Sequence, residues 1–190
     1  MIVTPASLPE VLLLQPRIHR DERGHFLETW SATRYSDVGI TDRFVQDNVS
    51  VSQLGVIRGL HFQHPQPQGK LVSCLLGTVF DVAVDVRWGS PTFGGWVGFE
   101  LSDDNGHQLW VPPGFAHGFQ ALSPEVVFAY KCTAPYAPSA ERSIRWDDPD
   151  IGIAWPRREP IVSAKDQSAL SLASHPTEAL PRFKAPDAPR

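Results

Sequence analysis

The sequence predicts an all-β protein built as a jelly-roll β-sandwich or barrel. Eighteen prolines and fourteen glycines interrupt the 190 residues at frequent intervals and leave little room for long helices. Short runs rich in β-branched and aromatic residues lie between them, at the spacing that is typical of sandwiches and barrels. Strands are expected at 11–14, 26–30, 49–51, 71–75, 78–87, 96–101, 107–111, 126–131 and 142–146, with two further strand-like blocks at 58–63 and 112–118.

Local patterns support the individual elements. Residues 81–87 place polar side chains among apolar ones in the alternation of a half-buried strand. Residues 103–106, Asp-Asp-Asn-Gly, are predicted to form a hairpin turn between two strands. Two short helices are expected, one within 31–38 and one over 165–172 with Ser163 as its N-cap.

A single domain accounts for the length. The chain is 42% hydrophobic and 20% charged, which is ordinary for a globular protein, and it is long enough to bury a core. We expect one jelly-roll domain over residues 1–173. The remainder, 174–190, is rich in proline and is expected to form a loosely ordered tail.

Composition also limits the partners and the location. The net charge of −4 gives no support for a nucleic-acid or membrane-surface role, so an anionic small molecule needs local Arg and Lys side chains to bind it. The chain starts without a signal-peptide pattern and contains no run of about 18 apolar residues, so we expect a cytoplasmic protein. Cys74 and Cys132 are expected to be free core thiols.

Basic and titratable side chains concentrate in the two strand-like blocks. The first block carries Arg58 and His61 and leads to Lys70, and the second carries His117 and is followed by Tyr130. A base, a fixed cation, a weak acid and an anion anchor, without an obvious nucleophile, suit proton transfer on an anionic substrate. Burying several basic groups together is unfavourable without an anionic ligand or an acid partner.

Each of these residues also has a plainer interpretation. Taken singly, His61 is typical of a hydrogen-bonded core histidine, and Tyr130 of a core or interface aromatic. Arg23 alone resembles a turn residue within a solvated charge cluster. Composition and spacing by themselves therefore indicate a β-sandwich with an anion-binding, acid–base site and go no further.

A metal site is the alternative that a jelly roll with two histidine blocks suggests. Metal-binding cupins use two histidines one residue apart, then a glutamate, and a further histidine in a Pro-x-Gly-x-x-His signature. Residues 112–117 match that signature, but Gln63 stands where the second histidine is needed and Lys70 where an acidic ligand is needed. His64 does not replace it, because residues three apart in a strand point to opposite faces. An ammonium group would also repel a divalent cation, so no metal is expected.

An ordered set of segments resembles one enzyme family. Each segment is weak alone, but the ordered set is specific. The segments are Asp-Glu-Arg-Gly-His-Phe (21–26), Phe-Val-Gln-Asp-Asn (44–48), Arg-Gly-Leu-His-Phe-Gln (58–63), Gln-Gly-Lys-Leu-Val (68–72), Val-Phe-Asp-Val-Ala-Val-Asp-Val-Arg (79–87), Gly-Ser-Pro-Thr-Phe-Gly (89–94), Gly-Phe-Ala-His-Gly-Phe (114–119), Ile-Arg-Trp-Asp-Asp-Pro (144–149) and Ile-Gly-Ile-Ala-Trp-Pro (151–156). From about residue 16 to 166 the chain resembles the dTDP-4-dehydrorhamnose 3,5-epimerase family, which implies a cupin-type jelly roll with a few short helices.

The resemblance implies a role for each matched residue. His61 falls at the catalytic base, and Asp166 falls at the acid that orients its imidazole. Tyr130 falls at the residue that protonates the opposite face, and Lys70 at the cation beside the keto oxygen. The other binding positions match contacts with the nucleotide sugar, except that His117 lines the pocket of the keto oxygen, Phe26 is a further pocket candidate and Tyr136 is the aromatic that stacks on thymine. They are Arg23, Phe26, Glu28, Gln46, Asp47, Asn48, Arg58, His117, Tyr136, Glu141 and Lys165.

The family resemblance also implies an activity and an assembly. It implies inversion at carbons 3 and 5 of dTDP-4-dehydro-6-deoxy-D-glucose, on the route to dTDP-L-rhamnose, with no metal or redox cofactor. It implies a homodimer that exchanges N-terminal strands, so that Arg23, Phe26 and Glu28 serve the partner's site. Val49 and Val51 depart from the pattern, where histidine and arginine are expected; this lowers the polarity expected near the phosphates or the pocket and leaves the catalytic set intact.

Other functions stay open on the sequence alone. An epimerase that acts at one carbon of another dTDP-4-keto-6-deoxy sugar uses the same His, Lys and Tyr. A non-catalytic nucleotide-sugar-binding sandwich would keep the arginines but has no need of Tyr130 or of a His61–Asp166 pair. A cupin ketoisomerase is expected to place its histidines differently, and a metal-dependent cupin oxygenase requires the ligands that this chain lacks.

Overall fold

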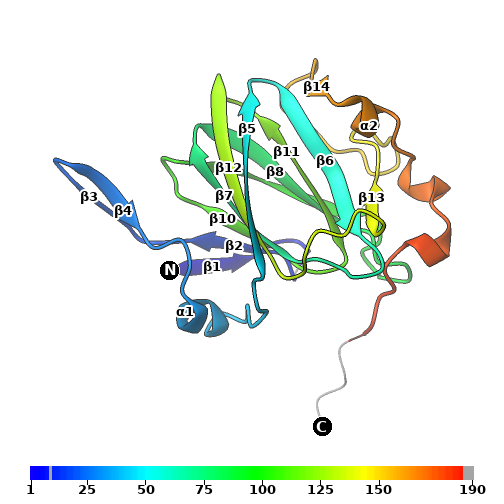
Figure 1. The fold of residues 1–190 in the computed structure, drawn as a ribbon, viewed down its shortest axis with the longest axis horizontal. Helices are drawn as coiled ribbons and strands as arrows, with labels where there is room; N and C mark the ends of the chain where they lie inside the picture. Colours follow the sequence, from blue (N-terminus) through cyan, green and yellow to red (C-terminus); the bar gives the residue numbers. More distant parts are fainter. Residues whose placement is uncertain (9, 186–190) are drawn as a thin grey trace, which may run out of the picture.

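Two β-sheets pack face to face and form the body of the protein, which confirms the all-β prediction (Figure 1). The computed structural model describes residues 1–8 and 10–185. In the first sheet the spatial order is β1 (Ile2–Pro5), β2 (Leu12–Gln15), β10 (Gln108–Val111), β7 (Lys70–Leu76), β12 (Glu125–Cys132) and β5 (Gln46–Gln53). In the second sheet it is β13 (Glu141–Ser143), β6 (Val56–Gln63), β11 (Phe115–Ala121), β8 (Thr78–Asp85) and β9 (Trp96–Ser102), with β14 (Ile161–Val162) parallel to β6.

The remaining elements lie outside these two sheets. Strands β3 (Ile18–Asp21) and β4 (Gly24–Leu27) form a hairpin that projects from the body (Figure 1). The helices are α1 (Ala32–Ser36), α2 (Ala164–Gln167) and two 3-10 turns, Leu172–Ser174 and Thr177–Ala179. The side chain of Ser163 caps α2 by accepting a hydrogen bond from the Asp166 amide, as predicted. Within the described ranges no helix is long and apolar enough to cross a membrane.

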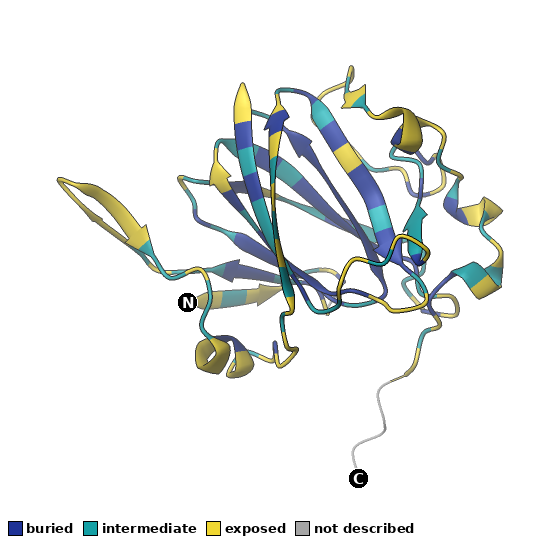
Figure 2. Cartoon of the chain, viewed as in Figure 1, coloured by how far each residue is buried: buried dark blue, intermediate teal, exposed yellow. Residues whose placement is uncertain are grey.

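Buried apolar side chains form three clusters. Figure 2 shows buried residues along the strands of the body, in dark blue. The first cluster lies between the sheets, where Phe119 of β11 stacks on Phe128 of β12 with ring centroids 4.3 Å apart. The second cluster includes Leu172 and Leu180 of the C-terminal segments. The third contains Tyr35 of α1. The interior is thus apolar, and polar groups within it require partners.

The turn at residues 103–106 does not close a hairpin, contrary to the prediction. Strand β9 pairs with β8 in the second sheet, whereas β10 pairs with β2 and β7 in the first, so the turn carries the chain between sheets. The side-chain oxygen of Asn105 accepts hydrogen bonds from the Ser102 and His107 amides, and Gly106 has φ +60°. The turn chemistry is as predicted, but the jelly-roll topology determines which strands pair.

The proline-rich tail is packed as far as the structure describes it. The Trp88 amide donates to the Pro181 carbonyl at 2.7 Å, and the Phe183 amide donates to the Trp88 carbonyl at 3.0 Å. The expectation of a loosely ordered tail is therefore wrong for residues 174–185, while 186–190 lie outside the described residues. The division of the chain into one domain and a tail stays a prediction.

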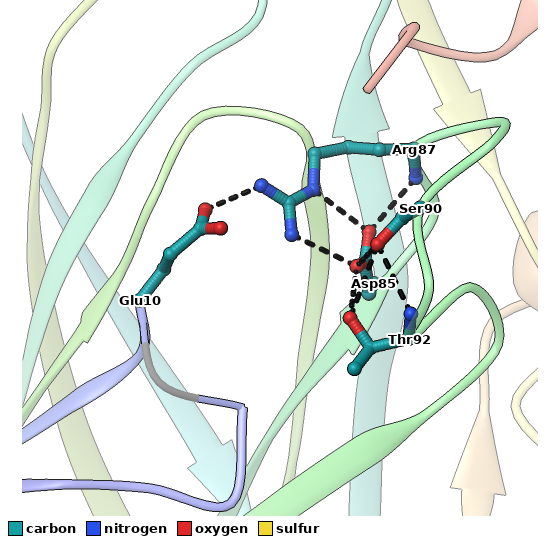
Figure 3. Close-up of polar contacts among 5 residues, drawn as sticks. All are labelled: Glu10, Asp85, Arg87, Ser90 and Thr92. Carbon is teal, nitrogen blue, oxygen red and sulfur yellow. Dashed lines mark hydrogen bonds and ion pairs between the residues drawn. The ribbon is translucent and has the colours of Figure 1, made fainter. Parts of the chain in front are cut away.

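A buried polar cluster fixes the loop that follows β8. The carboxylate of Asp85 is fully buried and accepts hydrogen bonds from the side chains of Arg87, Ser90 and Thr92 (Figure 3). Arg87 also pairs with Glu10. Its guanidinium carbon lies 4.4 Å from the ring centroid of Phe115, the first residue of β11. The cluster thus lies at the start of β11, the strand that also carries His117.

Candidate active site

A cleft between the two sheets collects polar side chains from both of them. His61 on β6 and His117 on β11 come from the second sheet, while Lys70 on β7 and Tyr130 on β12 come from the first. The cleft has two lobes of about 320 Å³ and 490 Å³, and His61, Lys70 and Tyr130 line both. The structure therefore brings together residues that lie far apart in the sequence.

The imidazole of His61 is held by a carboxylate behind it. His61 Nε2 lies 2.7 Å from Asp166 Oδ1, and the Gly59 amide donates to Asp166 Oδ2 at 3.5 Å. Burial alone would raise the pKa of Asp166, but the hydrogen bond from His61, together with the charge that His61 carries when protonated, holds it below its ordinary value. A carboxylate only accepts hydrogen bonds, so Nε2 carries the hydrogen of the neutral ring and Nδ1 keeps the lone pair that a base needs.

His117 has a carboxylate partner of its own. His117 pairs with His61 across the β6–β11 ladder, and its Nε2 lies 2.8 Å from Asp81 Oδ2. Burial raises the pKa of Asp81, and His117 offsets part of that shift. The two strands approach closely here, because a Cβ built on Gly59 would lie 2.6 Å from Gly118 Cα.

Lys70 is a buried cation that faces the cleft. Lys70 is 7% exposed, and none of the ion pairs found among the described residues includes its ammonium group. Burial lowers the pKa of Lys70. Electrostatic interactions with Cys132, Asp81 and Glu141 offset part of this decrease. An unpaired buried ammonium is unfavourable, and an oxyanion placed beside it would relieve that cost.

Tyr130 faces the same cleft from the first sheet. Burial raises the pKa of its phenol, with a further contribution from Cys132, while Arg58 lowers it. The hydroxyl therefore keeps its proton at neutral pH, as a proton donor must. Because β12 and β6 belong to opposite sheets, Tyr130 and His61 face the cleft from different sides.

Polar side chains continue from this centre to the mouth of the cleft. The Tyr136 hydroxyl donates to Glu141 Oε2 at 3.0 Å, and Lys165 Nζ pairs with the same oxygen at 2.6 Å. Gln46 Nε2 donates to Asn48 Oδ1 at 3.0 Å, and both amides line the smaller lobe. The mouth thus presents an exposed aromatic ring among hydrogen-bonding groups.

Arg58 is the arginine that lines the larger lobe. Its Nε donates to Ser52 Oγ at 3.0 Å and its Nη2 to the Val51 carbonyl at 3.1 Å. Arg58 takes part in none of the ion pairs found among the described residues, so its guanidinium remains available to an anionic ligand.

Four of the predicted binding residues lie outside this cleft. Arg23 and Phe26 are on the projecting hairpin, where Arg23 pairs with Asp21 and Phe26 is 69% exposed. Glu28 follows the hairpin and pairs with Arg34. The fourth, Asp47, points to the outer face of β5 and binds Lys131.

Sequence reasoning missed several residues of the site. The sequence pattern predicts only that Asp81 lies in a strand; the available signal for its role is an acid in a buried run opposite a histidine block. Gln63 and Gln68 line the smaller lobe, but their partners are backbone groups that no sequence motif identifies.

The donors present do not match a metal centre. Across residues 1–8 and 10–185 no three His, Cys, Asp or Glu side chains are grouped to hold a metal ion. The Nε2 atoms of both histidines instead face their own carboxylates, and a buried ammonium adjoins them.

Comparisons with known proteins point to one family. A family model described as dTDP-4-dehydrorhamnose 3,5-epimerase matches residues 5–174. The dTDP-4-dehydrorhamnose 3,5-epimerase of Salmonella typhimurium is 52% identical over 90% of this chain and 96% of that protein. A crystal structure of dTDP-6-deoxy-D-glucose-3,5-epimerase from Legionella pneumophila, in complex with dTDP-4-keto-L-rhamnose, is 53% identical with a TM-score of 0.94, covering 97% of this chain and 99% of that chain.

A more distant relative has a narrower activity in its name. The dTDP-4-dehydrorhamnose 3-epimerase of Streptomyces niveus is 39% identical over 91% of this chain and 84% of that protein. The family model covers most of the sequence, including all four residues at the centre of the cleft. This chain belongs to the dTDP-4-dehydrorhamnose 3,5-epimerase family.

Proposed function

We propose that the protein inverts carbons 3 and 5 of dTDP-4-dehydro-6-deoxy-D-glucose and so forms dTDP-4-dehydro-L-rhamnose. Its membership of the epimerase family and the relatives at about half identity support this activity. One structural observation carries the proposal: His61 and Tyr130 face one cleft from opposite sheets, with the buried Lys70 ammonium lining the same space.

Proton abstraction is the first step. Carbons 3 and 5 both flank the C4 ketone, so a proton on either is acidified by the same carbonyl. Nδ1 of His61 takes the proton, and the electron pair of the C–H bond moves to the ketone oxygen as an enolate. A carbon acid of this kind is much weaker than imidazolium, so the reaction requires stabilisation of the enolate. The preorganised, buried ammonium of Lys70 supplies it.

Protonation from the other side completes the inversion. The Tyr130 hydroxyl gives its proton to the enolate carbon as the carbonyl re-forms, on the face opposite His61. Solvent then returns a proton to the tyrosinate and removes one from the imidazolium. No net oxidation or reduction occurs in this cycle.

Groups away from the reacting carbons position the sugar. Arg58 is the anchor proposed for the diphosphate, because its guanidinium lines the larger lobe without a carboxylate partner. Binding energy gained at the nucleotide, remote from the chemistry, can orient the ring for proton transfer. The proposed nucleotide contacts at the smaller lobe and its mouth are Gln46, Asn48, Tyr136, Glu141 and Lys165.

We also propose that the protein is a homodimer in which each β3–β4 hairpin reaches the partner's site. The hairpin projects from its own body, and a two-stranded ribbon alone is only marginally stable in water (Figures 1 and 2). Val49 and Val51 are 65% and 59% exposed on the outer face of β5, an apolar surface that a second copy would cover. Arg23 and Phe26 do not line the cleft of their own subunit. In the dimer they would contact the ligand in the partner's cleft.

A single-carbon epimerase is the second candidate, and the Streptomyces niveus relative favours it. The same base, cation and acid serve either reaction. Incubation with dTDP-4-dehydro-6-deoxy-D-glucose in deuterated water, followed by NMR of the sugar ring, separates the two. Deuterium at carbons 3 and 5 is the expected result. Deuterium at one carbon would establish the single-carbon reaction, and no exchange with dTDP binding retained would indicate a binding protein.

A further inference from the structure

Three glutamine side chains hold the loop that forms the rim of the smaller lobe. This rim loop, residues 133–140, joins β12 to β13 near the end of β6 (Figure 1). Four consecutive residues of the loop each give a backbone group to a glutamine. The contacts are Gln68 Nε2 to the Ala134 carbonyl at 2.6 Å, Gln63 Nε2 to the Pro135 carbonyl at 3.3 Å, the Tyr136 amide to Gln46 Oε1 at 2.8 Å, and the Ala137 amide to Gln63 Oε1 at 2.9 Å.

Gln63 is the central member of this set. It is 4% exposed, and both ends of its amide are occupied. Besides its two contacts with the rim loop, Nε2 donates to the Gln66 carbonyl at 3.1 Å. Gln63 therefore ties the rim loop to the turn after β6, and a buried amide with every partner in place has a single favourable orientation. In metal-binding cupins this position carries a histidine ligand. Here the amide of Gln63 binds backbone groups of two loops instead.

The rim loop carries the aromatic ring at the mouth of the cleft. Tyr136 is 53% exposed, its amide is held by Gln46, and its hydroxyl is held by Glu141. Because the backbone on both sides of Tyr136 is bound by Gln63, the ring forms a fixed, flat surface before any ligand arrives. A preformed aromatic face binds a planar ring with less loss of conformational entropy than a mobile one.

We propose that Gln63 is a positioning residue for nucleotide binding, which acts by fixing Tyr136 as a preformed surface for the base. The inference rests on the proposed function, in which the cleft binds a dTDP sugar. Gln63 is distinct from the proton-transfer residues, so its loss weakens ligand binding more than it slows the chemical step.

Gln120 supplies a matched control within the same chain. Gln120 is also buried on a strand of the second sheet, and both ends of its amide also bind the backbone of a loop. Its Nε2 donates to the Arg157 carbonyl at 3.1 Å, and the Arg157 amide donates to its Oε1 at 2.9 Å. Gln120 lines neither lobe of the cleft, so replacing it breaks a similar buried clamp away from the nucleotide.

The test compares Gln63→Met with Gln120→Met in the full-length protein. Thermal unfolding, the dissociation constant for dTDP by calorimetry, and KM and kcat for the dTDP-4-keto sugar are measured for each. We expect Gln63→Met to raise the dTDP dissociation constant and KM about tenfold while kcat stays within about threefold. Gln120→Met is expected to lower the unfolding temperature comparably and to leave both binding parameters unchanged.

A second variant provides a signature that a general loss of stability would not produce. Gln63→Glu keeps an acceptor for the Ala137 amide but sets a carboxylate against two backbone carbonyls. Burial and this repulsion raise the pKa of the new carboxyl group, which can donate only while protonated. Binding of dTDP to this variant should therefore weaken as the pH rises and recover as it falls, relative to the wild type. If Gln63→Met does not fold, this pH dependence decides the question.

Three results would overturn the proposal. They are unchanged dTDP binding by Gln63→Met, equal loss of binding by the two methionine variants, and a Gln63→Glu variant whose binding follows the wild-type pH profile. A wild-type protein that fails to bind dTDP would overturn the proposed function itself. A wild type that binds and turns over, beside a Gln63→Met that binds equally well, removes only the positioning role.

Discussion

The imidazole of His61 lies 2.7 Å from the carboxylate of Asp166, although the two residues are 105 positions apart in the chain. Asp166 sits in α2, which the Ser163 side chain caps, and the Gly59 amide binds its second oxygen. The short helix therefore serves to place one carboxylate behind the proposed base. That placement fixes both the tautomer and the direction of the ring.

Asp166→Asn is expected to lower kcat by roughly 10²–10⁴-fold with little change in KM, because an amide can present a donor to Nε2 and favour the wrong tautomer. Steady-state kinetics measure the effect. Asp148→Asn is the control, since Asp148 is also buried and accepts the Leu172 amide at 2.6 Å but lines neither lobe. Equal losses of kcat in the two variants would contradict the orienting role of Asp166.

The alkaline limb of the pH profile should report Lys70. The protonated ammonium is the active form, and burial places its pKa below the ordinary 10.5, whereas burial raises the pKa of Tyr130 above 10.0. As the pH rises, kcat/KM should therefore fall as Lys70 loses its proton, at a pH below the ordinary value for a lysine. Lys70→Arg keeps its charge at all accessible pH values, so its remaining activity should decline only at higher pH. An alkaline limb at the same pH in both proteins would count against this assignment.

Hybrid dimers test whether the hairpin serves the partner's site. Arg23→Ala and His61→Ala are each expected to be nearly inactive as homodimers. If the hairpin crosses over, a hybrid of the two contains one site with both residues intact. Co-refolding equal amounts should then restore about a quarter of wild-type activity, because half of the dimers are hybrids and each has one complete site. A mixture no more active than its separate components would show that Arg23 does not act in the partner's site.

Asp85→Asn addresses stability away from the cleft. Removing one partner from the buried cluster of Figure 3 is expected to lower the free energy of unfolding by about 3–5 kcal/mol. Burial alone would raise the pKa of Asp85, but its hydrogen bonds hold it below the ordinary 3.8. Its stabilising contribution is thus present above pH 3.8 and is lost as the pH falls through the lower, folded-state pKa.

Urea unfolding at pH 7 and at successively lower pH measures the effect, and activity at low temperature should stay near that of the wild type. A stability difference between Asp85→Asn and wild type that does not shrink at acidic pH would contradict the proposed ionised state of Asp85.

Much of the fold could be predicted from the sequence because its signals are local. Strand propensity and the Ser163 cap depend on neighbouring residues. The cap forms as predicted, and every predicted strand overlaps an observed one, although many ends differ and β1, β3 and β14 were not predicted. The hairpin predicted at 103–106 failed because the pairing of β9 and β10 with other strands is a property of the whole topology. The packed tail was missed because proline indicates only that a segment is irregular, and contacts such as that with Trp88 come from elsewhere in the chain.

Site residues could be predicted where the chemistry of the side chain indicated a role. Residues whose role depends on which face of a strand they occupy were harder to predict. His61, Lys70 and Tyr130 do share one cleft. Val49 and Val51 were expected to change the polarity near the phosphates or the pocket, but strand alternation turns both to the outer face of β5.

Deuterium exchange by Tyr130→Phe tests the central claim, that base and acid act from opposite sheets. The variant is incubated with dTDP-4-dehydro-6-deoxy-D-glucose in deuterated water, and exchange and inversion are followed together by NMR. We predict that deuterium still enters the substrate with its configuration retained, because His61 continues to remove protons and return deuterons on its own face. Inversion should slow by about a hundredfold or more relative to exchange. Inversion at the wild-type rate, or equal loss of exchange and inversion, would contradict the assignment of His61 and Tyr130 to opposite faces.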